Sequence, residues 1–149
     1  MNALTKVWQL LLTRRDVDSA RVGVVGYCMG GRLGIHSATT PRVKALVGYC
    51  PTVRDQPTTE LSPVNPWDDV KNFRCPSIVL YGNDGKVTSV PVQDKGWKAF
   101  GENGQSLEWH FFPFGGHGFV DPGTAGYHPH TAQLSWPLVV DFLQRQLKD

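Results

Sequence analysis

Residues 22–35, VGVVGYCMGGRLGI, combine a strand, a glycine-rich turn and a helix in one short segment. Residues 21–27 are rich in Val and Gly and apolar on both faces, which is typical of a strand covered by helices on each side. A short helix is predicted from about residue 30 to residue 39, and Pro41 ends it. Because such a strand needs a helical layer above and below it, the segment favours an α/β architecture.

The rest of the chain repeats this alternation. Further strands are predicted over residues 43–49, 77–81 and 106–112, and further helices over residues 3–15, 91–101 and 135–147. The alternation predicts a parallel sheet of about four strands flanked by helices. Two long irregular segments, residues 51–76 and 113–131, would leave the carboxyl ends of strands, where open parallel sheets bind ligands.

Length, charge and cysteine content limit the class of protein. The 149 residues predict a single domain over residues 1–149. The formal charge is +2 and the basic residues are scattered, so neither a nucleic-acid nor a membrane partner is expected. The chain has three cysteines, Cys28, Cys50 and Cys75. This odd number and the lack of C-x-x-C spacing argue against a disulfide framework and a zinc site. The cysteine usage favours a reducing, cytoplasmic location.

The turn within the first segment has the spacing of a nucleophile elbow. Gly26-x-Cys28-x-Gly30 places a cysteine where serine often stands, between a strand and a helix. This turn strains the backbone of the nucleophile, and we expect both flanking glycines to be needed for the close approach of strand and helix. The helix N-terminus should favour the thiolate of Cys28. The alternative interpretation is a glycine-rich turn with a buried structural cysteine.

Two further residues supply the partners that such a nucleophile requires. Asp84 lies in Gly-Asn-Asp-Gly after the strand predicted at residues 77–81, and His117 lies in PFGGHGF after the strand at 106–112. Nucleophile, acid and then histidine is the chain order of an α/β-hydrolase triad. His117 would take and return the thiol proton while Asp84 orients the imidazole. Alternatively, Asp84 forms a turn and His117 is an ordinary loop histidine.

The sequence resembles the dienelactone hydrolase family in three motifs. These are GYCMGG, the Gly-Asn-Asp after an apolar strand, and GGHGF before a terminal helix. The resemblance implies an α/β-hydrolase fold and hydrolysis of lactones or esters without a metal or cofactor. It also implies a Cys28–His117–Asp84 triad and an oxyanion contact from the backbone N–H of Met29. Candidate substrate-binding residues in and beside the loops are Tyr27, Trp67, Phe119 and Tyr127.

The sequence departs from this family in two ways. The family's first strands, and a loop that supplies a second oxyanion N–H, precede the region that this sequence matches. Loss of one such donor typically lowers turnover by about 10²–10³-fold. Asp121 stands where the family has an arginine that binds an acidic lactone, so we expect a small neutral ester or lactone as substrate.

Without the preceding strands, residues 21–27 would form an apolar edge of the sheet. Such an edge is a template for pairing with another chain, so we expect a homodimer. The alternative to an enzyme is an inactive, truncated α/β-hydrolase scaffold that acts as a binding or assembly module. Cys50, after the second strand, is expected to be structural, although its place at a strand end could bring it to the site.

Overall fold

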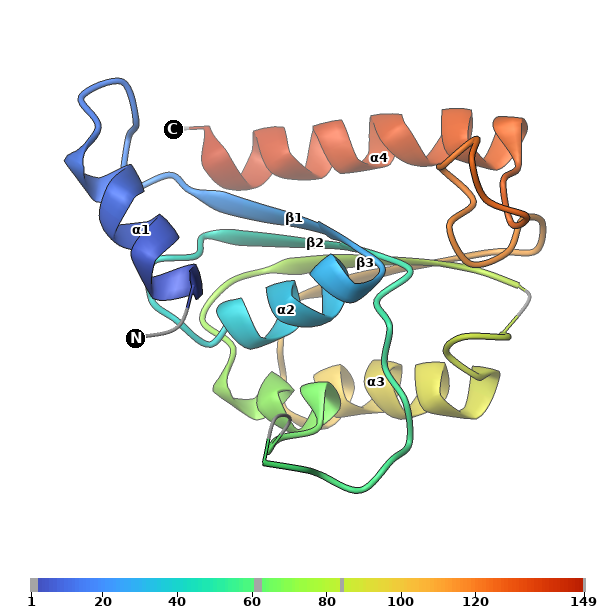
Figure 1. The fold of residues 1–149 in the computed structure, drawn as a ribbon. Helices are drawn as coiled ribbons and strands as arrows, with labels where there is room; N and C mark the ends of the chain where they lie inside the picture. The colour runs from blue at the N-terminus through green and yellow to red at the C-terminus, as the bar shows by residue number, and fades with distance from the viewer. Residues whose placement is uncertain (1–2, 61–62, 84, 149) are drawn as a thin grey trace.

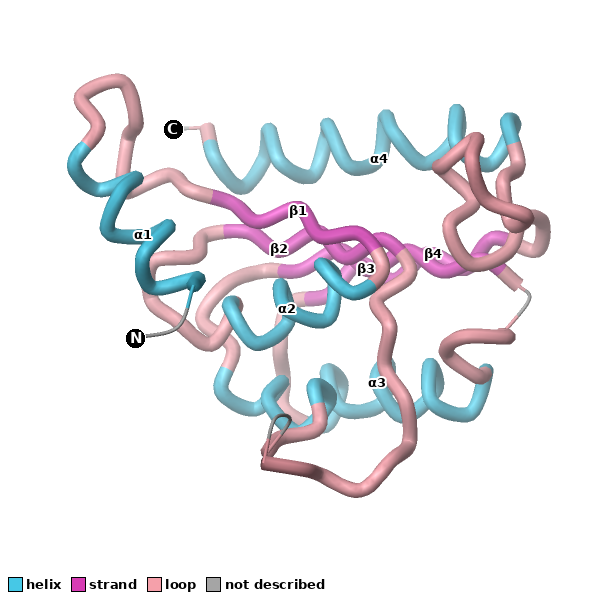
Figure 2. The backbone as a smooth tube through the Cα atoms, viewed as in Figure 1, coloured by secondary structure: helices cyan, strands magenta, loops and turns pink. Residues whose placement is uncertain are grey.

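A computed structural model describes residues 3–60, 63–83 and 85–148. Its single sheet has four parallel strands in the spatial order β1-β2-β3-β4, which confirms the predicted fold class. The strands are β1 Gly23–Tyr27, β2 Ala45–Tyr49, β3 Ser77–Gly82 and β4 Leu107–Phe112. All four therefore end at the same edge of the sheet, and Figure 2 shows the loops that leave them there.

Helices cover both faces of the sheet. They are α1 Ala3–Thr13, α2 Met29–Ser37, the short 3₁₀ helix η1 Pro66–Asn72, α3 Val90–Glu102 and α4 Pro129–Leu147. Figure 1 shows α4 on one face and both α2 and α3 on the other. Over the described residues, no helix combines the length and the apolar character that crossing a membrane requires.

Helix α4 begins earlier than the sequence predicted. We expected a helix from residue 135, but α4 begins at Pro129. The His128 side chain caps it by accepting the backbone N–H of Thr131 at 3.2 Å, and Pro129 suits the first turn because it has no N–H to satisfy. The hydroxyl of Thr131 donates to the carbonyl of Phe114 at 3.1 Å, which ties this helix start to the loop after β4. The irregular segment after β4 is consequently shorter than expected.

The strands differ in burial. Every residue of β2 and β3 is buried, as predicted for strands between helical layers. On β1, Val25 is 41% exposed and Tyr27 is 45% exposed, so the prediction of a strand covered on both faces is wrong at these positions. The reason is that β1 is an edge strand of this four-stranded sheet.

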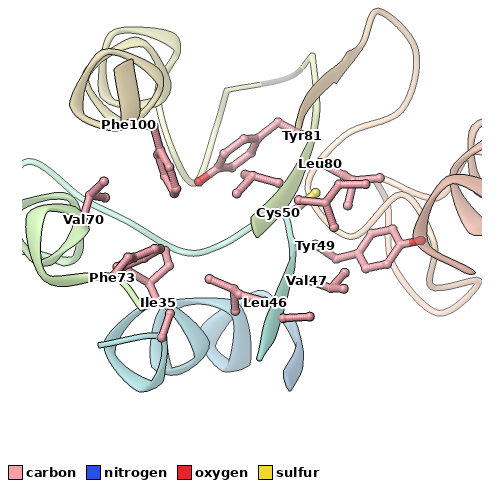
Figure 3. Packing of buried hydrophobic residues seen from close by; sticks show 14 of the residues in the cluster. Ile35, Leu46, Val47, Tyr49, Cys50, Val70, Phe73, Leu80, Tyr81 and Phe100 are labelled. Carbon is pink, nitrogen blue, oxygen red and sulfur yellow. The ribbon is translucent and has the colours of Figure 1, made fainter. Parts of the chain in front are cut away.

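The core lies on both faces of β2. Figure 3 shows Leu46 pointing toward Ile35 of α2 and Phe73, whereas Tyr49 points to the opposite face. All four side chains are at most 5% exposed. This alternation follows from the two-residue period of a strand. It anchors β2 in the core on both faces, up to the start of the loop beside Cys28.

Candidate active site

Cys28 lies in a sharp turn between β1 and α2. Its backbone has φ 50° and ψ −115°, a left-handed conformation that non-glycine residues rarely adopt. The backbone N–H of Cys28 donates to the carbonyl of Tyr49 at 2.9 Å, and its own carbonyl accepts N–H groups from Arg32 at 3.2 Å and Thr52 at 3.0 Å. These bonds hold the turn against both α2 and the segment after β2, in the conformation expected of a nucleophile elbow.

The two flanking glycines of the elbow differ in how much space surrounds them. A Cβ at Gly26 would lie 2.3 Å from the carbonyl oxygen of Gly30 and 2.7 Å from the Cα of Gly31, so glycine is required there. A Cβ at Gly30 would meet nothing within 4 Å, and the expected steric need at this position is therefore wrong. Gly31 is the tighter position, since its Cβ would lie 3.0 Å from the Cα of Pro51.

The thiol of Cys28 is half-buried. Burial is the larger cause that raises its pKa, and the nearby carboxylate of Asp121 raises it further. Both effects disfavour the thiolate. The expectation that the N-terminus of α2 favours the thiolate stays a prediction, which burial and Asp121 both oppose. A base close to the thiol would therefore help Cys28 to lose its proton.

Cys28 opens onto a cavity of about 530 Å³, which we call the Cys28 cavity. Its walls come from the ends of β1 and β2, from the loop after β4 and from the first turns of α4. The described lining residues are Tyr27, Cys28, Tyr49, Cys50, Gly118, Val120, Asp121, Pro122, Thr124, Ala132 and Trp136. Most of these side chains are apolar or aromatic, and the size suits a small organic molecule.

Cys50 lies beside Cys28 at the end of the neighbouring strand and lines the same cavity. It also has a left-handed backbone, with φ 44°, but its side chain is only 3% exposed. Burial raises the pKa of the Cys50 thiol, and hydrogen bonds from the backbone of Gly118, Gly82 and Phe119 partly offset this effect. The buried thiol suits a packing role at the base of the cavity.

His117 is half-buried in the loop after β4. This loop is closed by the N–H of Gly116 donating to the carbonyl of Gly126 at 2.9 Å and by the N–H of His128 donating to the carbonyl of Phe119 at 3.0 Å. The residue after His117, Gly118, lines the Cys28 cavity. The loop therefore brings the main chain at His117 to the cavity that contains the thiol.

Asp84 lies outside the described residues. Its neighbour Asn83 donates its backbone N–H to the carbonyl of Gly115 at 3.0 Å, and the side-chain amide of Asn83 donates to the carbonyl of Pro113 at 3.2 Å. A Cβ at Gly82 would lie 2.6 Å from the same Gly115 oxygen. The end of β3 thus packs directly against the loop that carries His117, as the predicted triad requires of these two segments.

The remaining predicted site residues have different surroundings. Met29 is the first residue of α2, where a backbone N–H has no partner within the helix. Tyr27 lines the Cys28 cavity and stacks on Tyr49, with ring centroids 5.0 Å apart. Phe119 is fully buried, and its ring lies edge-on to the ring of Tyr49. Tyr127 lines a separate shallow hollow with Asn83.

Trp67, also predicted near substrate, is 6% exposed and packs in the core against Gly96 and Trp109. It is not among the described lining residues of the Cys28 cavity. Sequence reasoning missed Tyr49 and Trp136, which do line it. Pro129 was the signal that could have identified Trp136. A proline after a capping histidine indicates the start of a helix, and a helix that begins there has Trp136 in its second turn.

The sequence model of the dienelactone hydrolase family matches residues 2–147. The chain is 27% identical over 131 residues to a Bradyrhizobium protein named as a probable 2-oxo-3-(5-oxofuran-2-ylidene)propanoate lactonase, covering 88% of this chain and 53% of that protein. It is 26% identical over 126 residues to a carboxymethylenebutenolidase of Pseudomonas putida, covering 85% and 49%. The chain therefore spans about half the length of these curated relatives.

Solved structures show the same fold. A Klebsiella pneumoniae protein assigned to the dienelactone hydrolases superposes with a TM-score of 0.88 at 23% identity, over 95% of this chain and 59% of that one. The acylaminoacyl peptidase of Pyrococcus horikoshii gives a TM-score of 0.81 at 18% identity, over 98% and 27%. These two proteins differ in length, and both contain the four-stranded arrangement of this chain.

Proposed function

We propose that this chain, which belongs to the dienelactone hydrolase family, carries the nucleophile of a cysteine hydrolase that acts on small esters or lactones. The observation that carries the proposal is the turn at Cys28. Its thiol lies on a left-handed residue at a helix start and opens onto an apolar cavity of about 530 Å³. The relatives named as a probable lactonase and as a carboxymethylenebutenolidase support the reaction class.

In the first half of the proposed reaction, the sulfur of Cys28 attacks the carbonyl carbon of the ester. The thiol proton passes to the imidazole of His117, which Asp84 orients. The negative charge that develops on the carbonyl oxygen is held by the backbone N–H of Met29. The carbon–oxygen bond to the alcohol then breaks, His117 returns its proton to the alcohol, and a thioester on Cys28 remains.

In the second half, a water molecule attacks the thioester carbonyl. Its proton passes to His117, the carbon–sulfur bond breaks, and the proton returns to the sulfur of Cys28. The free acid leaves. Because both half-reactions use the same base, loss of His117 should slow both of them.

The raised pKa of Cys28 gives His117 a necessary role. A thiol with a raised pKa attacks more readily if a base removes its proton during the attack. The rate of acylation should therefore increase with pH as the thiol begins to ionise.

The test is hydrolysis of p-nitrophenyl acetate by the parent chain and by Cys28→Ala and His117→Ala. We expect each substitution to lower kcat/KM by about 10³-fold or more, since members of such a unit act together. Cys75→Ala is the matched control, because Cys75 is a buried thiol that precedes β3 at the opposite end of the sheet. If Cys28→Ala and His117→Ala match the parent, the proposal is wrong.

The exposed edge of the sheet supports a second role, in assembly. Besides Val25 and Tyr27, Met29 is 66% exposed and Leu33 is 48% exposed, so apolar side chains continue from β1 into α2. We propose that a second copy of the chain covers this edge in a homodimer. Sedimentation velocity at micromolar concentration should then detect a dimer that Val25→Lys dissociates. A monodisperse monomer of the parent chain would exclude it.

A further inference from the structure

One carboxylate faces the Cys28 cavity. Asp121 is the carboxylic side chain among its described lining residues, and it is close enough to raise the pKa of Cys28. One of its oxygens accepts the backbone N–H of Gly123 at 2.8 Å. The ion pairs found among the described residues do not include Asp121. Its charge is therefore available to a molecule in the cavity.

Aromatic rings form much of the remaining wall. Tyr27 stacks on Tyr49 with an angle of 9° between the rings, and Trp136 of α4 is 54% exposed at the cavity. The faces of such rings carry partial negative charge and attract cations. A carboxylate beside several aromatic rings is the arrangement that proteins use to bind ammonium groups.

Filling this cavity has an electrostatic consequence. A bound molecule displaces water from the side of Asp121 that faces the cavity, and this costs free energy unless the molecule supplies a compensating charge or hydrogen bond. A neutral apolar group supplies neither, and an anionic group adds repulsion. A cationic group offsets the lost hydration and gains attraction from both the carboxylate and the rings.

From these observations, we propose that the Cys28 cavity selects esters that carry a positively charged ammonium group, with Asp121 as the residue that determines this specificity. The proposal rests on the proposed hydrolase function and narrows its substrate class. The ammonium group takes no part in the reaction. It positions the ester carbonyl near Cys28 and adds binding energy.

Binding tests the proposal without any need for catalysis. Choline and 3,3-dimethylbutanol have the same shape and differ in charge, and quenching of tryptophan fluorescence or NMR shifts can measure the binding of each. We expect choline to bind at least about tenfold more tightly than the neutral alcohol, and Asp121→Asn to abolish this difference. The matched control is Asp94→Asn, which removes the same charge from a residue of α3 paired with Lys98. Equal binding of both alcohols, or equal choline affinity in Asp121→Asn and parent, would overturn the proposal.

Hydrolysis distinguishes this inference from the function on which it rests. Acetylcholine and 3,3-dimethylbutyl acetate are matched substrates whose hydrolysis releases a proton that can be titrated. We expect kcat/KM to favour acetylcholine by about tenfold in the parent and in Asp94→Asn, and to favour neither ester in Asp121→Asn. Hydrolysis of both esters at equal kcat/KM would refute the charge preference and leave the hydrolase function standing. Choline binding that depends on Asp121, without hydrolysis of either ester, would refute the hydrolase function and support the cation site.

Discussion

The tetrapeptide Val-Gly-Tyr-Cys occurs twice in the chain, at residues 25–28 and 47–50. The two copies lie side by side on β1 and β2, with Val25 opposite Val47, Gly26 opposite Gly48 and Tyr27 opposite Tyr49. Both cysteines have positive φ, 50° and 44°. The same four residues thus produce the same strand ending twice, and both endings line one cavity.

The two copies differ in the residues that come after each cysteine. Cys28 precedes Met29 and helix α2, so backbone N–H groups without helical partners lie next to a half-buried thiol. Cys50 precedes Pro51, which has no N–H, and the side chain of Cys50 is buried. The strand ending therefore provides the backbone conformation. The residues after it determine whether the thiol is accessible to a bound molecule and whether backbone N–H donors lie beside it.

The largest expected difference concerns the glycines of the two copies. In Gly26→Ala the new Cβ would overlap backbone atoms of Gly30, so we expect a loss of more than about 4 kcal/mol in the free energy of unfolding, or no folding at all. In Gly48→Ala the new Cβ would lie 2.8 Å from the Cγ of Pro51, a ring atom that can move only by a change of ring pucker or a small backbone shift, and we expect a loss of about 1–3 kcal/mol. Denaturant unfolding measures both.

Gly30→Ala serves as the control for that pair, because its Cβ would meet nothing within 4 Å. Its free energy of unfolding should stay within about 1 kcal/mol of the parent value. Equal destabilisation by Gly26→Ala and Gly48→Ala would show that the two endings are not packed as described.

The next difference is in thiol reactivity. Iodoacetamide should label Cys28 at least about tenfold faster than Cys50 in the folded chain, because Cys28 is partly accessible whereas buried thiols react through local opening. The rate at Cys28 should increase steadily above pH 7, since its pKa is raised. Peptide mass spectrometry measures the rate at each site. Equal, slow labelling of Cys28, Cys50 and Cys75 would contradict the assignment of Cys28 as the accessible thiol.

The smallest expected effect isolates the charge beside Cys28. Asp121→Asn removes a carboxylate that raises the pKa of this thiol, so the pKa should fall and the thiolate fraction at pH 7.5 should increase. We expect labelling of Cys28 to accelerate by about two- to fivefold. Labelling of Cys50 should not change. A slower rate at Cys28 would mean that Asp121 acts on the thiol in some way other than through its charge.

Much of the sheet was predictable from local sequence. Short runs of apolar residues between helical segments identify strands such as β2 and β3, because both faces of these strands are buried. The conformation of Cys28 was predictable for the same kind of reason, since the glycine at position 26 leaves room for a tight turn between strand and helix.

Other features depend on which strands are neighbours, and local patterns do not contain that information. Cys50 reaches the Cys28 cavity because β1 and β2 pair in one particular register, although the repeated tetrapeptide was a visible signal of it. The burial of Trp67 depends on the close approach of Gly96 of α3, far along the chain. The pKa of Cys28 depends on burial and on Asp121, and neither is contained in the position of the thiol at a helix start.

The loop after β4 is braced in two separate places. Its base is held to β3 and closed by the bond between Gly116 and Gly126, and its crest forms a small turn in which the N–H of Asp121 donates to Gly118 and the N–H of Thr124 donates to Asp121. The crest carries the charge that faces the cavity, whereas the base carries His117. Residues 121–125 can therefore be exchanged to change the charge beside the cavity while the hydrogen bonds that close the base of the loop are kept.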